Sequence, residues 1–340
     1  MTTTPARGGP VARASTGDGD RPPARRTVGL VVNPTAGHGR GREAGLLASQ
    51  LLTRAGIEVL DVSGASVADA VARARAAALD GLDALVVVGG DGMVHLGVNA
   101  TVETPTPLAV VATGSGNDFA QVLGLPVHDV TASVAQVVAA LERPARAVDA
   151  VHVEAVVPGG RPHDPAHGDD AWGGRWYAGV LSLGLDADVN ARANTYSWPS
   201  GHGRYVRAVF ACLAGFSPYG YRLTTDAGTQ TFRGTLVAVA SSSQIGGGLR
   251  IAPDAAVDDG LLDVVYATEL SRRGILRLFP RLYRGTHLSH PAVHVVRTTS
   301  VVIEASGDGR VPPVAFADGE VVGPVPLRAQ VHPGALRVLA

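Results

Sequence analysis

The stretch Ala84-Leu-Val-Val-Val-Gly-Gly-Asp-Gly-Met93 decides the fold class of this chain. Five apolar residues, three of them valine, predict a strand that is buried on both faces in a parallel sheet. The glycines after it let the backbone turn tightly and approach a ligand closely. Asp91 is the only charged residue here, and a carboxylate beside bare backbone amides suits a site for metal and phosphate. The stretch alone fits equally well a plain turn in which Asp91 caps the following helix.

Strand and helix patterns alternate on both sides of this stretch, up to about residue 148. Such alternation predicts an α/β domain, in which a parallel sheet carries helices on both faces. Because parallel strands end on the same edge, the turns that follow them, at 33–41, 89–92 and 113–118, should share one cleft. The predicted strands are 28–34, 57–62, 84–88 and 108–112, and the predicted helices are 43–54, 67–79, 93–100 and 130–141.

The pattern changes after about Val148 and predicts a second domain that is mainly antiparallel. Helical spacing interrupts the strands near 203–216 and 271–283. The strand-like runs are 176–183, 221–225, 235–240, 261–266, 293–296, 301–304 and 335–339.

The length of 340 residues and the 46% apolar content suit two domains with cores of their own. We expect a disordered tail at 1–26, a first domain at 27–148 and a second domain at 149–340, whose C-terminal strands can pack back on the first. The 29 basic and 30 acidic residues give no support for a nucleic-acid partner. The single cysteine, Cys212, favours a reducing, cytoplasmic compartment. The sequence contains no apolar run long enough to span a membrane.

Glycine turns and helix N-termini bind phosphate through successive backbone N–H groups. Three such turns on one edge, accompanied by uncharged donors, favour a nucleotide polyphosphate site. The Walker pattern is absent, and Gly37-His-Gly-Arg-Gly41 lacks the spacing of a dinucleotide-binding loop. The donors are Asn33, Thr35, Gly37, Thr113, Ser115 and Asn117.

Five short motifs follow one another along the chain. They are Asn33-Pro-Thr-Ala-Gly37, Gly89-Gly-Asp-Gly92, Thr113-Gly-Ser-Gly-Asn-Asp-Phe-Ala120, Ile251-Ala-Pro-Asp-Ala-Ala-Val-Asp-Asp-Gly-Leu-Leu-Asp-Val264 and Asp318-Gly-Glu320. Each motif is weak alone. Together, in this order and over nearly the whole chain, they resemble the diacylglycerol kinase catalytic family, which includes bacterial soluble diacylglycerol kinases and sphingosine and ceramide kinases.

The resemblance implies a kinase that uses ATP and Mg²⁺ to phosphorylate a lipid hydroxyl, most directly diacylglycerol to phosphatidic acid. It implies a phosphofructokinase-like nucleotide domain and a β-sandwich-like domain that holds lipid. It places Asp91 and Glu320 at the catalytic centre, and the sequence leaves open which of them takes the proton of the acceptor hydroxyl. It assigns Asp118, Asp149 and Asp259 to the metal. The residues it assigns to ATP are Asn33, Pro34, Gly37, Gly89, Gly90, Gly92, Thr113, Gly114, Ser115 and Asn117.

Three positions depart from the family's usual run Gly-Gly-Asp-Gly-Thr-x-Asn-Glu, because Met93, His95 and Leu96 stand where Thr, Asn and Glu are usual. A catalytically weak nucleotide- or lipid-binding homologue is therefore one alternative. An NAD kinase, which shares Gly-Gly-Asp-Gly, is another. The expected partner is a lipid substrate at a membrane surface, where attachment should be peripheral and transient. A homodimer is compatible with the sequence. His163 and His167 have the spacing of metal ligands on a helix, but the proline between them favours a solvated loop.

Overall fold

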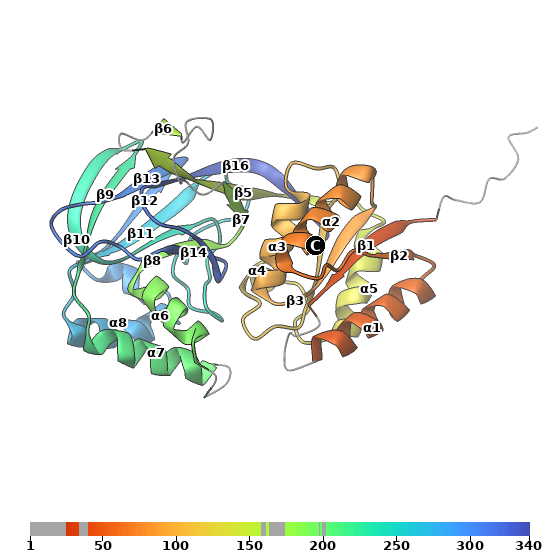
Figure 1. The fold of residues 1–340 in the computed structure, drawn as a ribbon, viewed down its shortest axis with the longest axis horizontal. Helices are drawn as coiled ribbons and strands as arrows, with labels where there is room; N and C mark the ends of the chain where they lie inside the picture. The colour runs from red at the N-terminus through yellow and green to blue at the C-terminus, as the bar shows by residue number, and fades with distance from the viewer. Residues whose placement is uncertain (1–24, 34–39, 158–160, 163–173, 197, 199–201) are drawn as a thin grey trace, which may run out of the picture.

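The computed structural model describes residues 25–33, 40–157, 161–162, 174–196, 198 and 202–340. Within these residues, two domains lie side by side and one sheet continues from the first into the second (Figure 1).

The first domain is built on parallel strands in the order β2 (Glu58–Asp61), β1 (Thr27–Val32), β3 (Ala84–Gly89) and β4 (Leu108–Ala112). Every residue of β3 and β4 is buried, as continuous apolar runs in a parallel sheet require. The chain extends the sheet from β1 to β2 in one direction and from β1 to β3 in the other. This reversal opens a crevice beyond the carboxyl ends of β1 and β3, where such sheets bind ligands.

Helices cover both faces of this sheet (Figure 1), which confirms the predicted α/β domain. The side chains of alternate β3 residues point to opposite faces of the sheet and pack against the helices on each face. Leu85 and Val87 belong to the core under the second and third helices, and Val86 and Val88 to the core under the first and fifth. The helices are α1 (Arg40–Arg54), α2 (Val67–Asp80), α3 (Asp91–Thr101), α4 (Asp118–Val122) and α5 (Val130–Ala140).

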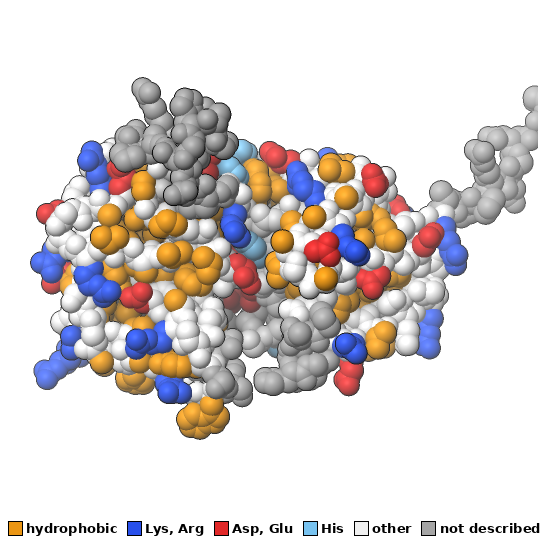
Figure 2. Space-filling view, viewed as in Figure 1, with side chains coloured by type: hydrophobic (Ala, Val, Ile, Leu, Met, Phe, Trp, Pro, Cys, Tyr) orange, Lys and Arg blue, Asp and Glu red, His pale blue; other side chains and the backbone are white. Residues whose placement is uncertain are grey.

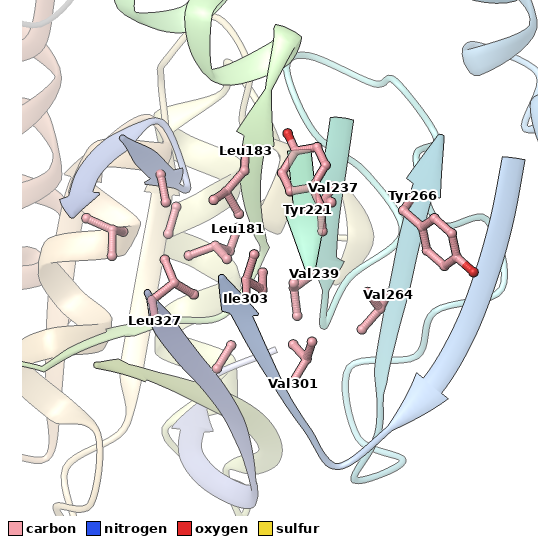
Figure 3. Packing of buried hydrophobic residues seen from close by; sticks show 14 of the residues in the cluster. Leu181, Leu183, Tyr221, Val237, Val239, Val264, Tyr266, Val301, Ile303 and Leu327 are labelled. Atoms are coloured by element: carbon pink, nitrogen blue, oxygen red, sulfur yellow. The ribbon is translucent and has the colours of Figure 1, made fainter. Parts of the chain in front are cut away.

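The second domain consists mainly of strands, and its elements in chain order are β5 (Arg146–Val157), β6 (Arg161–Pro162), β7 (Arg175–Tyr177), β8 (Val180–Gly184), α6 (Leu185–Asn194), α7 (His202–Ala214), β9 (Tyr219–Thr225), β10 (Gly228–Ala240), β11 (Leu262–Thr268), α8 (Arg272–Leu282), the 3₁₀ helix η3 (Thr286–Ser289), β12 (Val293–Thr298), β13 (Ser300–Ala305), β14 (Ala315–Ala317), β15 (Glu320–Gly323) and β16 (Leu327–Val338). β10 pairs antiparallel with β8, β9 and β11, which confirms the predicted antiparallel character. Figure 3 shows the core, where Leu181, Val239 and Ile303 meet from β8, β10 and β13.

The C-terminal strand β16 joins the domains. It pairs antiparallel with β5 and β13, and its last residue, Val338, pairs in parallel with Leu108 of β4. The predicted domain boundary at residue 148 falls within β5. Strand β5 was missing from the sequence prediction, because its partner β16 lies at the far end of the chain.

The prediction of one strand over 176–183 is wrong, because the chain leaves the ladder at Ala178 and Gly179 and so forms β7 and β8. The cause is Asp318, whose carboxylate accepts hydrogen bonds from the backbone N–H groups of Ala178 (3.3 Å) and Val180 (3.2 Å). A continuous strand would commit those donors to its neighbours.

Asn99 on α3 ties the first domain to the second. Its Nδ2 donates to the carbonyl oxygens of His95 and Trp176, both at 2.8 Å, and its Oδ1 accepts from the backbone N–H of Trp176 at 3.0 Å. Because Trp176 belongs to β7, this side chain fixes the start of the second domain against the helix that begins at Asp91.

Candidate active site

The turn after β3 delivers Asp91 to the first position of α3. Carboxylates are stabilised there by the free N–H groups and the dipole of the helix. The Oδ2 atom of Asp91 accepts a hydrogen bond from the backbone N–H of Asn117 at 2.8 Å. A Cβ added to Gly116 would lie 2.5 Å from that same oxygen, so the absence of a side chain at Gly116 lets the second turn approach Asp91.

The turns at 89–92 and 113–118 are joined directly. The carbonyl oxygen of Gly89 accepts from the backbone N–H groups of Thr113 (2.9 Å) and Gly114 (3.3 Å). A Cβ on Gly114 would lie 2.4 Å from the Cα of Gly90, so only glycine fits there. Asn117 stands in the left-handed region at φ 58° and braces its own turn, with Oδ1 accepting from Gly114 N and Nδ2 donating to Gly114 O.

Asp118, at the start of α4, is held by a glycine loop of the second domain. Its carboxylate accepts from the backbone N–H groups of Gly247 (2.9 Å) and Gly248 (2.8 Å). Gly246, Gly247 and Gly248 all have positive φ, at 65°, 84° and 97°, which bulkier residues rarely adopt. The sequence analysis did not single out this loop, although three consecutive glycines were a signal for it.

Asp318 also belongs to the site, although the sequence analysis gave it no role. It lies with Gly319 in the two-residue turn between β14 and β15, where both have positive φ. Its carboxylate accepts from the backbone N–H groups of Ala178 and Val180, and its Oδ2 also lies 3.8 Å from Nδ1 of the buried His95. The same hairpin carries the exposed Glu320 to the start of α3, where a Cβ on Gly92 would lie 2.7 Å from Glu320 Oε1.

Burial and neighbouring negative charge raise the pKa of Asp91 and of Asp118. Burial, and then the charges of Asp118 and Asp318, raises the pKa of Asp91 to about 6, although the N–H groups of Asn117 and Asp118 oppose the shift. Burial likewise raises the pKa of Asp118, against the hydrogen bonds from Gly247 and Gly248. Asp91 Oδ1 is buried and accepts no hydrogen bond from any described residue. A cation bound to this oxygen would relieve the repulsion, so the residues present fit a divalent metal ion.

The predicted metal ligands do not converge. Asp149 is buried, with Oδ2 accepting from Gly260 N at 2.7 Å and Oδ1 accepting from Gly334 N at 2.9 Å. Asp259 forms an ion pair with Arg297. These two acids therefore bind at the end of the loop before β11, and in the described residues no hydrogen bond or ion pair joins either of them to Asp91, Asp118 or Asp318. Nowhere in the described ranges do three His, Cys, Asp or Glu side chains form a group that could hold a metal.

The remaining predicted residues are placed in part. Asn33 follows β1 directly, whereas Pro34, Gly37, His163 and His167 lie outside the described residues. Ser115 is exposed on the second turn. Figure 2 shows acidic side chains in a recess between the two domains, where these turns and the β14–β15 hairpin meet.

The unusual residues of α3 all point inward. Met93, His95 and Leu96 are buried. Met93 covers Gly89, since a Cβ on Gly89 would lie 2.4 Å from Met93 Cγ. The side chain in the usual threonine position therefore packs on the strand end.

An apolar cavity of about 100 Å³ lies in the second domain, under α7 and α8. Ile245 and Leu249 line it, and they flank the glycines that bind Asp118. One loop thus connects the cavity to the acids. Asp186 also lines the cavity, and its burial raises the pKa of its carboxyl group. The apolar side chains that complete the lining include Val209, Ile275, Leu278, Phe279 and Leu282.

The glycine turns, the clustered acids and the two domains define a kinase fold, and comparison with known proteins gives the family. The sequence model of the diacylglycerol kinase catalytic domain matches residues 27–153, and that of the YegS C-terminal NAD kinase beta sandwich-like domain matches residues 179–340. The diacylglycerol kinase of Mycobacterium tuberculosis is 33% identical over 314 residues, which cover 92% of this chain and 94% of that protein. The diacylglycerol kinase of Bacillus subtilis is 24% identical over 285 residues, covering 82% and 85%. The chain belongs to the diacylglycerol kinase catalytic family of lipid kinases, which are phosphotransferases.

Solved structures share the fold. A diacylglycerol kinase from Bacillus anthracis superposes with a TM-score of 0.63 at 16% identity, covering 93% of this chain and 96% of that one. Yeast NADH kinase in complex with NADH gives 0.51 at 11% identity, covering 92% and 82%. Both confirm the predicted fold class, including the β-sandwich-like second domain.

Proposed function

We propose that this lipid kinase transfers the γ-phosphate of ATP, with Mg²⁺, to the hydroxyl of diacylglycerol and so forms phosphatidic acid. One observation carries the proposal. Asp91, with an unpartnered buried oxygen, lies where two glycine turns meet Asp118 and Asp318, and a single loop joins this group to an apolar cavity.

The two turns supply the phosphate site. Backbone N–H groups at the start of α3 and α4 carry partial positive charge, and the glycines leave room for phosphate oxygens to approach them. Phosphoryl transfer requires position and neutralised charge more than covalent chemistry, and fixed backbone dipoles provide both.

Asp91 and Asp118 are the residues that would hold Mg²⁺. The ion usually takes one or two carboxylates and completes its shell with water and substrate phosphates, so a pair of acids suffices. When bound, Mg²⁺ supplies charge neutralisation at the phosphates. Asp149 and Asp259 then act elsewhere, as a brace for the loop at 257–260.

The proton of the acceptor hydroxyl goes to Asp91 or Glu320. A carboxylate that holds Mg²⁺ is a poor general base, because the bound cation lowers its pKa, and this counts against Asp91. Glu320 is exposed at the mouth of the site beside Gly92, which suits a group that meets the incoming hydroxyl. We therefore assign the base to Glu320.

The apolar cavity would take part of an acyl chain. Its 100 Å³ is small against the several hundred Å³ of typical ligand sites, so a whole lipid needs α7 or α8 to move outward. The described lining is apolar apart from a few groups such as Asp186 and Ser182, which does not suit a nucleotide acceptor. This favours a lipid over NAD.

An acceptor panel tests the proposal. The purified chain is incubated with radiolabelled ATP, Mg²⁺ and either diacylglycerol, a sphingoid base or NAD. We expect label in phosphatidic acid above the level of an Asp91→Ala control. Label in NADP instead would support the NAD kinase alternative, and ATP binding by calorimetry without any labelled product would support the catalytically weak homologue.

A further inference from the structure

Two stretches of the second domain carry arginines and no acid. Residues 189–225 contain Arg192, Arg204, Arg207 and Arg222, and no Asp or Glu. Residues 270–303 contain no acid either, and their arginines are Arg272, Arg273, Arg277, Arg281, Arg284 and Arg297. The chain as a whole has 29 basic and 30 acidic residues, so these stretches concentrate positive charge. Helix α7 lies within the first stretch and helix α8 within the second.

Two arginines of α8, Arg273 and Arg277, face away from the protein. Ile275 and Leu278 are buried, whereas Arg273 and Arg277 are exposed and follow each other at the i, i+4 spacing of one helix face. Arg284, just after the helix, is also exposed. None of these three arginines forms an ion pair with any residue that the structure describes. Their charges are therefore available to an anionic partner.

Large apolar side chains are exposed on the same two helices. Phe210 of α7 is 60% exposed, and Leu276 of α8 is 43% exposed. Trp198, before α7, is 75% exposed, and Tyr283, after α8, is 42% exposed. Aromatic rings and arginines combine an apolar body with a polar end, which suits the headgroup region of a bilayer. Figure 2 shows apolar and basic side chains interspersed along the edge where Figure 1 places α7 and α8.

These helices also cover the apolar cavity. Val209 of α7 and Leu278, Phe279 and Leu282 of α8 line it from the inside. The exposed face of each helix therefore lies opposite the cavity wall, and a lipid entering from that face would pass between or beside them. None of the described helices, α7 and α8 included, has the length and apolarity to cross a membrane.

We propose that the outer faces of α7 and α8 form a docking face (Phe210, Arg273, Leu276, Arg277 and Tyr283) for the surface of a bilayer that contains anionic phospholipid. The arginines attract the headgroups, and the apolar side chains enter the interface. The choice of a bilayer rests on the proposed function, because the acceptor of a diacylglycerol kinase resides in a membrane.

Vesicle sedimentation tests the docking face with the full chain. Phosphatidylcholine vesicles with and without phosphatidylglycerol are compared at low and high salt, for wild type and for Arg273→Glu/Arg277→Glu. Since each arginine near an anionic surface contributes appreciably, we expect binding to the mixed vesicles to fall about tenfold or more in the variant. Binding of the wild type should also weaken at high salt. The matched control is Arg42→Glu/Arg143→Glu, which makes the same charge change on exposed arginines of the first domain and should bind nearly as wild type.

The apolar part of the docking face has its own pair of variants. Phe210→Ala/Leu276→Ala should weaken binding to mixed vesicles even at high salt, whereas Leu46→Ala/Leu79→Ala, at exposed positions of α1 and α2, should not. Equal effects of each variant and its control would overturn the proposal. The proposal would also be overturned if the wild type sedimented in the absence of vesicles and the docking-face substitutions abolished this sedimentation. The docking face would then bind a second copy of the chain.

Phosphorylation of a short-chain, water-soluble diacylglycerol separates the two proposals. The docking-face variants should keep the kcat/KM of the wild type on this acceptor. Vesicle binding without any diacylglycerol phosphorylation would sink the proposed function and leave the docking face intact. Phosphorylation of diacylglycerol, together with unchanged vesicle binding by the variants, would support the proposed function and overturn the docking face.

Discussion

Replacing Asp91 by Asn should stabilise the fold while it abolishes activity. The pKa of Asp91 is raised from 3.8 to about 6, and each pKa unit corresponds to about 1.4 kcal/mol, which gives a ceiling of about 3 kcal/mol. Because the side chain is partly exposed to solvent, we expect the free energy of unfolding of Asp91→Asn to exceed that of the wild type by about 1–2 kcal/mol at about pH 7.5. Asparagine keeps an oxygen for the N–H of Asn117 and removes the repulsion from Asp118 and Asp318.

The raised pKa of Asp91 determines how the stability of the fold changes with pH. The folded pKa of Asp91 lies above the unfolded value, so the charged carboxylate lowers stability above about pH 6, and this loss fades as the pH falls from 6 towards 4. Denaturant titration of wild type and Asp91→Asn at about pH 7.5 and about pH 4 measures the difference in their free energies of unfolding. The variant should be the more stable protein at the higher pH, and the difference should largely vanish at the lower pH.

Asp149→Asn is the matched control. Both oxygens of the buried Asp149 accept a backbone N–H, and the amide nitrogen of asparagine cannot accept either one, so this variant should lose about 2 kcal/mol. If Asp91→Asn is destabilised like Asp149→Asn, or its gain is the same at both pH values, the electrostatic reasoning is wrong.

Three more outcomes are expected. Because protonation of Asp91 in the free enzyme removes a proposed ligand of Mg²⁺, kcat/KM should fall on the acid side with an apparent pKa near 6, which a pH–rate profile measures; a flat profile between about pH 5 and 8 would exclude that role. Gly116→Ala places a Cβ 2.5 Å from an Asp91 oxygen and should lower kcat at least about tenfold, whereas Gly215→Ala, where a Cβ meets nothing, should not; equal rates would contradict the geometry. Asn99→Ala removes the hydrogen bonds to Trp176 and should lower the free energy of unfolding by about 1–3 kcal/mol, as denaturant titration would show; an unchanged value would mean that this tie between the domains is unimportant.

The sequence predicted the first domain well because its signals are local. Val86, Val87 and Val88 form an apolar run typical of a strand that is buried on both faces, and the glycine turns follow such runs directly. That the turns at 89–92 and 113–118 meet also follows from sequence, since parallel strands end on one edge.

The parts that sequence missed depend on distant pairings. Asp318 acquires its role because β14 pairs with β8, far earlier in the chain, and places the carboxylate against Ala178 and Val180. Asp118 is held by glycines of the second domain, and no local pattern connects them. The predicted grouping of Asp149 with Asp118 came from the family resemblance alone, which carries residues over without their distances.

Transfer of label from radiolabelled ATP to diacylglycerol, measured for wild type and Asp91→Asn side by side with Mg²⁺ present and chelated, tests the central claim most directly. We predict labelled phosphatidic acid from the wild type with Mg²⁺, and none after chelation or from the folded Asp91→Asn variant. Equal labelling by the wild type and Asp91→Asn, or labelling that survives chelation, would contradict the account.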